Sequence, residues 1–175
     1  MRADSNEVEI KAKAAKAASK KLAYLSTDVK NKALLAIADD LITKKSDILA
    51  DNHRDYIEGK KVGMSEAMLD RLLLNTERIK GIVADVRAVA ALPDPIGETF
   101  EMRTLPNGLQ IGKKRVPLGV IGAVYEGRPN VTVHISVLCL KSGNTIMLRG
   151  GKEALNTNST LVKIIQGTAY RTGIP

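Results

Sequence analysis

The sequence predicts an α/β protein in which N-terminal helices and a β-hairpin arm precede the first β-α-β-α half of a doubly wound parallel sheet. Three observations carry this prediction: helical spacing of apolar residues over the first ninety positions, an Asn-Gly pair between two β-type runs, and alternating strand and helix patterns after residue 118. We therefore expect a helical region at 1–95, a hairpin and oligomerisation arm at 96–117, and the start of an α/β domain at 118–175.

The helical region begins with a capping-box pattern, Asp4 followed by Glu7, and Ser26 or Thr27 restarts the chain after the first helix. The strongest amphipathic signal is a stripe at i, i+3, i+4, i+7 and i+8, formed by Leu34, Ile37, Ala38, Leu41 and Ile42. That stripe predicts a docking face for the rest of the protein.

Weaker helix continues to a bend at Gly59 and Gly63, after which Ser65 can cap a short helix. Another helix starts near Thr76 and ends at the Pro93-Asp94-Pro95 junction, which is stiff and marks the change from helical to extended composition.

Two β-type runs between residues 99 and 116 flank Pro106, Asn107 and Gly108, which predicts a hairpin. Because isolated hairpins are only marginally stable, we expect this arm to pair with another sheet or a second subunit, which favours a homo-oligomer.

The segment after the hairpin has the pattern of a Rossmann-like β-α-β-α unit. Residues 120–125 and 145–148 are short apolar strands, residues 131–141 form a helix that ends at Gly143, and a second helix runs from about 155 to 170. A right-handed crossover makes two such strands parallel, and ligands then bind at their carboxyl ends.

Both loops at those carboxyl ends are cationic and rich in hydrogen-bond donors, which favours phosphate or carboxylate groups and predicts a nucleotide site and an anionic substrate. The first loop offers Arg128 and Asn130, and the second offers Arg149, Gly150, Gly151 and Lys152. Alternative interpretations remain open: a surface ion pair for Arg128, a helix cap for Asn130 and a solvated turn for Lys152.

Composition excludes several classes of protein. Hydrophobic residues make up 44% of the chain and charged residues 26%, and no apolar run approaches a bilayer span, so we expect a cytoplasmic protein with no membrane contact. The net charge of +8 comes with one Phe and no Trp, which argues against nucleic acid as a partner. The lone cysteine, Cys139, is expected to be a buried structural thiol, and two histidines without clustered ligands predict no metal site.

Four stretches together resemble the gamma-glutamyl phosphate reductase (glutamate-5-semialdehyde dehydrogenase) family of proline biosynthesis, a branch of the aldehyde dehydrogenase superfamily. They are MSEAMLDRLLLNTERIKGI, VAALPDPIGE, RVPLGVIGAVYEGRPNVTV and LCLKSGNTIMLRGGKEA. The resemblance implies an aldehyde dehydrogenase-type fold, in which residues 118–175 start an NADP-binding domain whose cofactor-binding and catalytic parts are incomplete.

The resemblance also implies an oxidoreductase reaction. A cysteine displaces phosphate from L-glutamyl 5-phosphate, and NADPH then reduces the thioester to L-glutamate 5-semialdehyde. Family members are more than twice as long, and their catalytic cysteine lies beyond residue 175, so Cys139 is not that nucleophile and the chain is not expected to turn over alone. Glutamate 5-kinase is a candidate partner.

Residue roles follow from the resemblance only where the motifs match. Asn130 resembles the asparagine that holds an oxyanion in the superfamily, and Arg128 would then bind substrate carboxylate or phosphate. Many members carry Lys-Pro-x-Glu where this chain has Arg149 to Lys152. Replacing the acidic position by Lys152 favours NADP over NAD. His134 departs from the family pattern, which has an acidic residue there.

Three other readings remain. The same fold could serve as a non-catalytic binding or assembly module, the basic chain could bind nucleic acid, or the segment could come from a kinase–reductase fusion. Steep salt dependence of DNA or RNA binding would identify the second reading.

Overall fold

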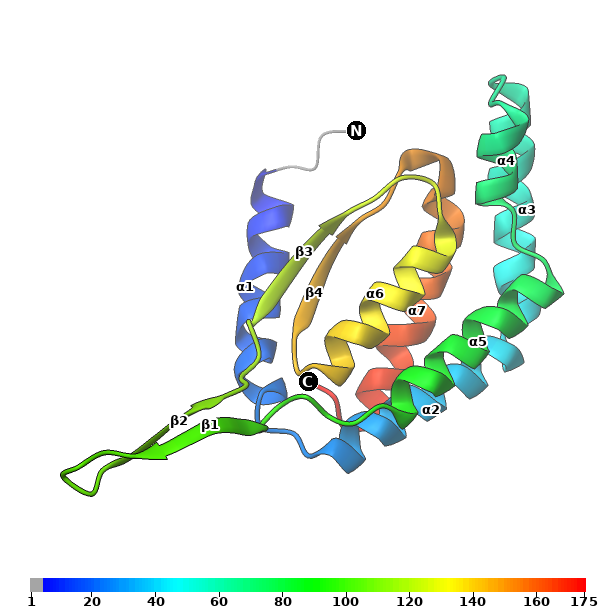
Figure 1. The fold of residues 1–175 in the computed structure, drawn as a ribbon. Helices are drawn as coiled ribbons and strands as arrows, with labels where there is room; N and C mark the ends of the chain where they lie inside the picture. Colours follow the sequence, from blue (N-terminus) through cyan, green and yellow to red (C-terminus); the bar gives the residue numbers. More distant parts are fainter. Residues whose placement is uncertain (1–4) are drawn as a thin grey trace.

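The computed structural model describes residues 5–175, and Asp4 of the expected capping box lies outside them. Its helices and strands follow the order α1 (Ser5–Leu22), α2 (Thr27–Thr43), α3 (Lys45–Lys61), α4 (Glu66–Leu72), α5 (Thr76–Ala91), β1 (Thr99–Thr104), β2 (Gln110–Lys114), β3 (Val120–Val124), α6 (Pro129–Lys141), β4 (Thr145–Arg149), the 3-10 turn η1 (Lys152–Ala154) and α7 (Leu155–Arg171). Figure 1 shows α1 on one side of the β3–β4 pair, α6 and α7 on the other with α2 to α5 beyond them, and the β1–β2 hairpin projecting away.

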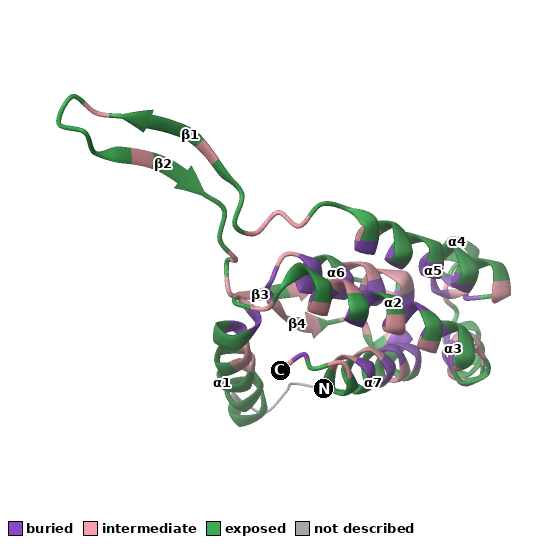
Figure 2. Cartoon of the chain, turned by 90° about the horizontal axis from the view of Figure 1, so that it is seen from below, coloured by how far each residue is buried: buried purple, intermediate pink, exposed green. Residues whose placement is uncertain are grey.

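The β-α-β-α prediction is confirmed. β3 and β4 pair in parallel, from Val120 opposite Thr145 to Val124 opposite Arg149, and α6 makes the crossover. Helices α1 and α6 both contact β4, and Figure 2 shows them on opposite sides of the strand pair. Gly143 ends the crossover in the left-handed region, with φ of 69°, as its position after the helix predicted.

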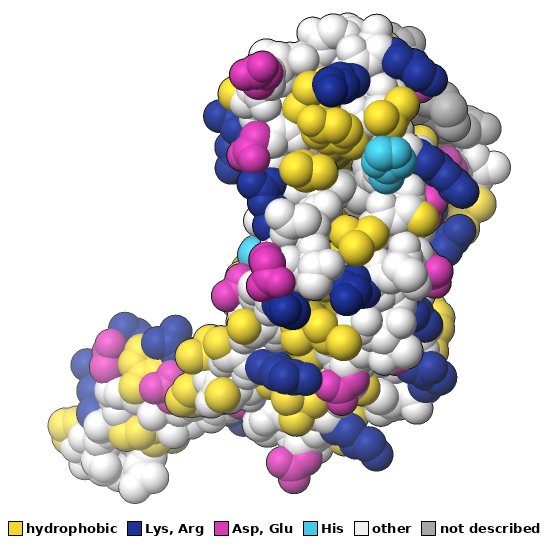
Figure 3. All heavy atoms as spheres, turned by 90° about the vertical axis from the view of Figure 1, so that its right-hand side faces the viewer, with side chains coloured by type: hydrophobic (Ala, Val, Ile, Leu, Met, Phe, Trp, Pro, Cys, Tyr) yellow, Lys and Arg dark blue, Asp and Glu magenta, His cyan; other side chains and the backbone are white. Residues whose placement is uncertain are grey.

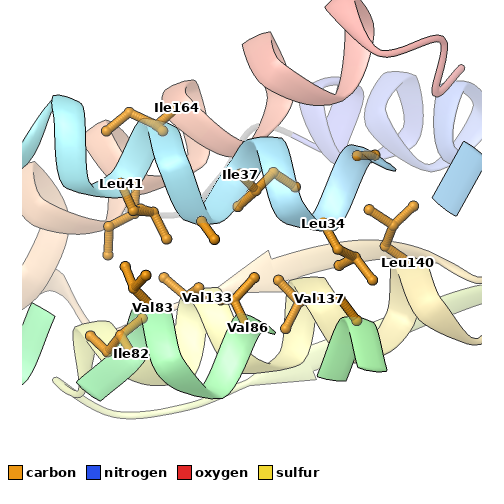
Figure 4. Packing of buried hydrophobic residues seen from close by; sticks show 14 of the residues in the cluster. Leu34, Ile37, Leu41, Ile82, Val83, Val86, Val133, Val137, Leu140 and Ile164 are labelled. Carbon is orange, nitrogen blue, oxygen red and sulfur yellow. The ribbon is translucent and has the colours of Figure 1, made fainter. Parts of the chain in front are cut away.

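One hydrophobic core joins the helical region to the α/β segment. Figure 4 shows α2, α5, α6 and α7 meeting side chain to side chain, and Figure 2 shows buried residues concentrated on these helices. The most deeply buried members are 0–1% exposed: Leu34, Ile37, Leu41, Val86, Val133, Val137 and Leu161. The stripe predicted on α2 is therefore its docking face. The prediction is wrong only for Ile42, which is 41% exposed on the last turn of the helix.

The helix starts follow side-chain capping. Ser26 Oγ accepts from the Val29 amide, Ser65 Oγ from Met68, and Asn75 Oδ1 from Arg78, at 3.4, 3.4 and 2.8 Å. The predictions for Ser26 and Ser65 are confirmed. Gly59, expected at a bend, instead lies inside α3, where an added Cβ would come within 3.2 Å of Leu69.

The hairpin pairs β1 and β2 antiparallel and exposes nearly all of its side chains. Its turn differs from the two-residue loop that Asn-Gly favours. That loop would make Pro106 the flanking strand residue, whose amide N–H must pair across the hairpin, and proline has no N–H. Instead Pro106 and Asn107 are the central residues of the turn, because the Gly108 amide donates to the Leu105 carbonyl at 2.8 Å. Gly108 follows them with a φ of 85°.

A buried ion pair fixes the Pro93–Pro95 junction. Lys30 is 1% exposed, and its Nζ lies 2.5 Å from Asp94 Oδ2, which also accepts from Thr27 at 2.8 Å. Burial raises the pKa of Asp94, but bonds from Lys30, Ile96 and Thr27 outweigh it, so the pKa lies below its usual value. Lys141, 3% exposed, donates beside this pair to Asn31 and Ala90, and burial lowers its pKa.

Candidate functional site

The loop after β3 presents Arg128 and Asn130 in different ways. Arg128 is the N-cap of α6 but makes no side-chain capping bond, Pro129 takes the first helical position, and Asn130 follows inside the first turn. The cap interpretation of Asn130 therefore does not describe this structure. Among residues 5–175, the Arg128 guanidinium forms no ion pair, so the surface ion pair is not seen either.

The turn after β4 is built for close packing. An added Cβ on Gly150 would come within 3.2 Å of Tyr125 Oη and would also strike Asn158, so only glycine lets the chain pass here. Arg149 and Lys152 are both exposed on either side of this glycine pair. The turn thus offers glycine backbone without side chains, flanked by two exposed cationic side chains.

The two turns touch each other through a polar chain. Thr132 Oγ1 lies 2.6 Å from Tyr125 Oη and donates to Asn158 Oδ1 at 2.7 Å, which joins the end of β3 to α6 and α7. Burial raises the pKa of Tyr125, so the phenol stays protonated. The Glu153 side chain lies against both turns. A Cβ on Gly127 of the first turn would sit 2.7 Å from its Cγ, and a Cβ on Gly151 of the second turn would clash with its carboxylate.

Although the turns meet, their residues line different hollows. Arg128 and Asn130 line a hollow of about 520 Å³ between α4, α5 and the start of α6. Gly150 and Gly151 line a second hollow of about 710 Å³ that follows β4 between α1 and α7. Arg149 and Lys152 are in the lining of neither hollow, and the structure does not bring Arg149 into one cleft with Arg128.

Asp55 of α3 occupies the start of α7, so the free amides of this helix N-terminus are bonded within the protein. This carboxylate is 4% exposed and accepts from the Thr157 amide at 2.8 Å and the Thr157 hydroxyl at 2.6 Å. It also accepts from the amide and side chain of Asn156, at 3.2 and 2.8 Å. A phosphate at the second turn would therefore meet side-chain cations and glycine backbone, with the Glu153 carboxylate lying over Gly151, and not the amides of this helix.

His134 lies in the first hollow and faces Asp85 of α5. Its Nε2 is 3.1 Å from Asp85 Oδ2, within ion-pair distance, yet the ring nitrogen is buried without a hydrogen-bond partner in the described structure. The two side chains carry opposite charges only when the imidazole is protonated.

Cys139 lies on α6 and is 7% exposed, and burial raises the pKa of its thiol. Both properties disfavour the thiolate that a nucleophile needs. Within residues 5–175 no three His, Cys, Asp or Glu side chains gather in a way that could hold a metal ion, and no helix there is long and apolar enough to cross a membrane.

Figure 3 shows the face made by the α3–α5 side of the molecule, with Lys and Arg side chains scattered among Asp, Glu and apolar patches. On this face the basic groups form no continuous stripe of the kind that tracks a nucleic-acid backbone.

No family model matches the chain. Among curated proteins, the gamma-glutamyl phosphate reductase of Dehalococcoides mccartyi is 53% identical over 169 residues, 97% of this chain and 40% of that protein. The Aeromonas salmonicida protein of the same name is 54% identical over 162 residues, 93% of this chain and 39% of its own length. The chain thus spans about 40% of the length of these relatives.

Solved structures agree in fold. A probable aldehyde dehydrogenase from Listeria monocytogenes superposes with a TM-score of 0.68 at 20% identity, over 97% of this chain and 35% of the other. At that identity the likeness shows the fold alone, and it defines an α/β protein of the aldehyde dehydrogenase type.

Two closer structures narrow the class. The gamma-glutamyl phosphate reductase of Thermotoga maritima matches with a TM-score of 0.94 and 42% identity, over 97% of this chain and 41% of that one. The Saccharomyces cerevisiae protein of the same name matches with a TM-score of 0.89 and 32% identity, over 94% of this chain and 43% of the other. In sequence and fold, the chain belongs to the gamma-glutamyl phosphate reductase family.

Proposed function

We propose that this chain serves in the NADPH-dependent reduction of L-glutamyl 5-phosphate to L-glutamate 5-semialdehyde, a step of proline biosynthesis in the cytoplasm. The observation that carries the proposal is the match, at 53% identity over 97% of the chain, to a protein named gamma-glutamyl phosphate reductase. Cationic turns at the carboxyl ends of two parallel strands support it, because both the cofactor and the substrate carry phosphate.

The turn after β4 suits the adenosine end of the cofactor. Gly150 and Gly151 line an open hollow, and the exposed Arg149 and Lys152 form no ion pair within residues 5–175. Lys152 would attract the 2′-phosphate that distinguishes NADP from NAD, and a glutamate in its place would repel it. When bound, NADPH supplies the hydride; the side chains of this turn only hold and orient it.

Arg128 and Asn130 would hold the substrate. The Arg128 guanidinium, which forms no ion pair with another residue in 5–175, can form a bidentate bond to a carboxylate or phosphate, and the amide of Asn130 can donate to an oxyanion. Cys139 is buried with a raised pKa, so we propose that the chain on its own binds ligands but does not turn them over.

A cofactor titration tests the proposal. We expect the 175-residue chain to bind NADPH more tightly than NADH, and Lys152→Glu to remove about tenfold of that preference, which corresponds to about 1.4 kcal/mol. Lys163→Glu, an exposed change on α7 outside both hollows, is the control and should leave the preference unchanged. An unchanged preference in Lys152→Glu would contradict the cofactor assignment.

We also propose that the hairpin joins two copies of the chain, with glutamate 5-kinase as a further candidate partner. Met102 and Leu109 of the arm are 59% and 55% exposed, so a second copy that paired with the hairpin would cover apolar surface there. Sedimentation of the chain should show an oligomer that Met102→Ser with Leu109→Ser weakens. A non-catalytic assembly module would show this oligomer but would not bind NADPH.

A further inference from the structure

The hollow between α4, α5 and the start of α6 contains charges of both signs that the fold does not use. We propose that this hollow recognises the amino-acid end of an anionic amino acid: Asp85 takes the α-ammonium group, and Arg71 and Arg128 take the anionic groups. The inference rests on the proposed function and deepens it, because it names the groups that distinguish a glutamyl substrate from a simple acyl phosphate.

Some charges in this hollow are already neutralised by each other. The Arg78 guanidinium donates to Asp70 Oδ1 at 2.6 Å and to the Leu73 carbonyl at 2.8 Å, so it ties α4 to the start of α5. Arg78 and Asp70 therefore act as a structural pair and leave little capacity for a ligand.

Two other cations have no such partner. Arg71 of α4 and Arg128 of α6 line the same hollow, and neither side chain forms an ion pair or hydrogen bond with another residue in 5–175. An unpaired guanidinium on a flat surface is ordinarily just solvated. Here the two line one hollow, Arg71 from α4 and Arg128 from the N-cap of α6, so an anionic ligand in that hollow would meet both.

Asp85 is the carboxylate of this hollow that no Arg or Lys neutralises within residues 5–175. It lies on the face of α5 away from the buried Val83 and Val86, its side chain is 62% exposed, and its partner among the described residues is His134, which carries charge only when protonated. His134 Nε2 lies 3.1 Å from Oδ2, so among the described residues Oδ1 is the Asp85 oxygen left to accept from an ammonium group.

The size and the remaining wall of the hollow fit a short amino acid. Its volume of about 520 Å³ lies in the range of small-molecule sites. Leu73, Leu74 and Ile82 provide apolar wall for methylene groups. Two free cations, one free carboxylate and an apolar wall together match the two carboxylates, one ammonium and two methylenes of L-glutamate, the unphosphorylated analogue of the proposed substrate.

An NMR titration of the 175-residue chain tests the inference with two probes: L-glutamate, and glutarate, which lacks the ammonium group. We expect saturable shifts in the backbone resonances of Ile82, Asp85 and His134 and about tenfold tighter binding of L-glutamate, because only L-glutamate has an ammonium group to pair with Asp85. In Asp85→Asn the preference should disappear. Glu77→Gln, an exposed change on the same helix outside the hollow, should keep it.

A second variant separates charge recognition from a folding defect. Arg71→Gln should weaken both probes by about tenfold yet keep their ratio, and Arg103→Gln on the hairpin should change neither affinity. Circular dichroism confirms that each variant is folded.

The inference is overturned if L-glutamate fails to saturate the wild-type chain, if glutarate binds equally well, or if Asp85→Asn keeps the preference. NADPH titration of the same samples distinguishes this failure from failure of the proposed function. A chain that binds NADPH without discriminating the two probes overturns only the inference, whereas discrimination without NADPH binding contradicts the cofactor assignment alone.

Discussion

Asp55 and Asp85 are aspartates on two helices of the same fold, and the structure treats them in opposite ways. Asp55 is 4% exposed and accepts four hydrogen bonds, all from Asn156 and Thr157 at the start of α7. Asp85 is 62% exposed and faces His134 across 3.1 Å without a hydrogen bond.

The difference separates carboxylates that hold the fold from those that remain available to a ligand. Breaking a buried, fully bonded carboxylate leaves donors without partners, which is costly, whereas a solvated carboxylate can be neutralised with little effect on stability. Asp94, paired with the buried Lys30, belongs with Asp55. Replacing Asp55 or Asp94 should therefore lower stability, whereas replacing Asp85 should affect ligand binding.

The largest effect is expected at Asp94. Asp94→Ala leaves the Lys30 ammonium buried without its counter-charge, which should lower the free energy of unfolding by about 3–5 kcal/mol. Urea denaturation measures this change. The matched double variant Lys30→Met with Asp94→Ala should recover part of the loss. A loss below about 1 kcal/mol in the single variant would mean that the pair is solvated, contrary to its burial.

Asp55→Ala should come next, with a loss of about 2–3 kcal/mol, because it removes the cap of α7 and strands the buried Thr157 amide and hydroxyl. Glu58→Ala changes an exposed carboxylate on the same helix and should cost less than about 0.5 kcal/mol. Equal losses in the two variants, measured by thermal and urea unfolding, would erase the distinction between bonded and solvated carboxylates.

Acid should gradually remove part of the contribution that Asp94 makes to the free energy of unfolding, an effect smaller than that of the substitutions. The pKa of Asp94 lies below its usual 3.8, so the folded state binds its proton less readily than the unfolded state. The contribution is therefore complete above that value and is lost as the pH falls through the lower, folded pKa. Unfolding free energies from pH 6 to pH 2 should show a shallower acid dependence in Asp94→Asn, and an identical profile would show that Asp94 does not titrate as described.

Local patterns predicted the elements of the fold well. β3, α6, β4 and α7 each carry their own periodicity and their own breakers, such as Gly143, so neighbouring residues are enough to place them. The capping residues Ser26 and Ser65 are equally local signals. The type of hairpin turn was harder to predict, because Pro106 overrides the usual preference of Asn-Gly for a two-residue loop.

The polar contacts could not be read from the sequence, because each joins segments that are distant along the chain. Asp55 caps a helix whose bonded residues lie 101 and 102 positions away, and Lys30 pairs with Asp94 across the whole α2–α5 region. Arg128 and Asn130, which the sequence analysis singled out, are near neighbours along the chain, whereas Asp85 and Arg71, which line the same hollow, were missed. Only the packing of α4 and α5 against α6 brings these charges together.

The most direct test is to measure stability and ligand binding on one variant, Asp85→Asn. If Asp85 is reserved for a ligand, the free energy of unfolding should stay within about 0.5 kcal/mol of the wild-type value while the Kd for L-glutamate rises about tenfold. A loss of about 2 kcal/mol in stability with an unchanged Kd would show instead that Asp85, like Asp55, holds the fold together and binds nothing.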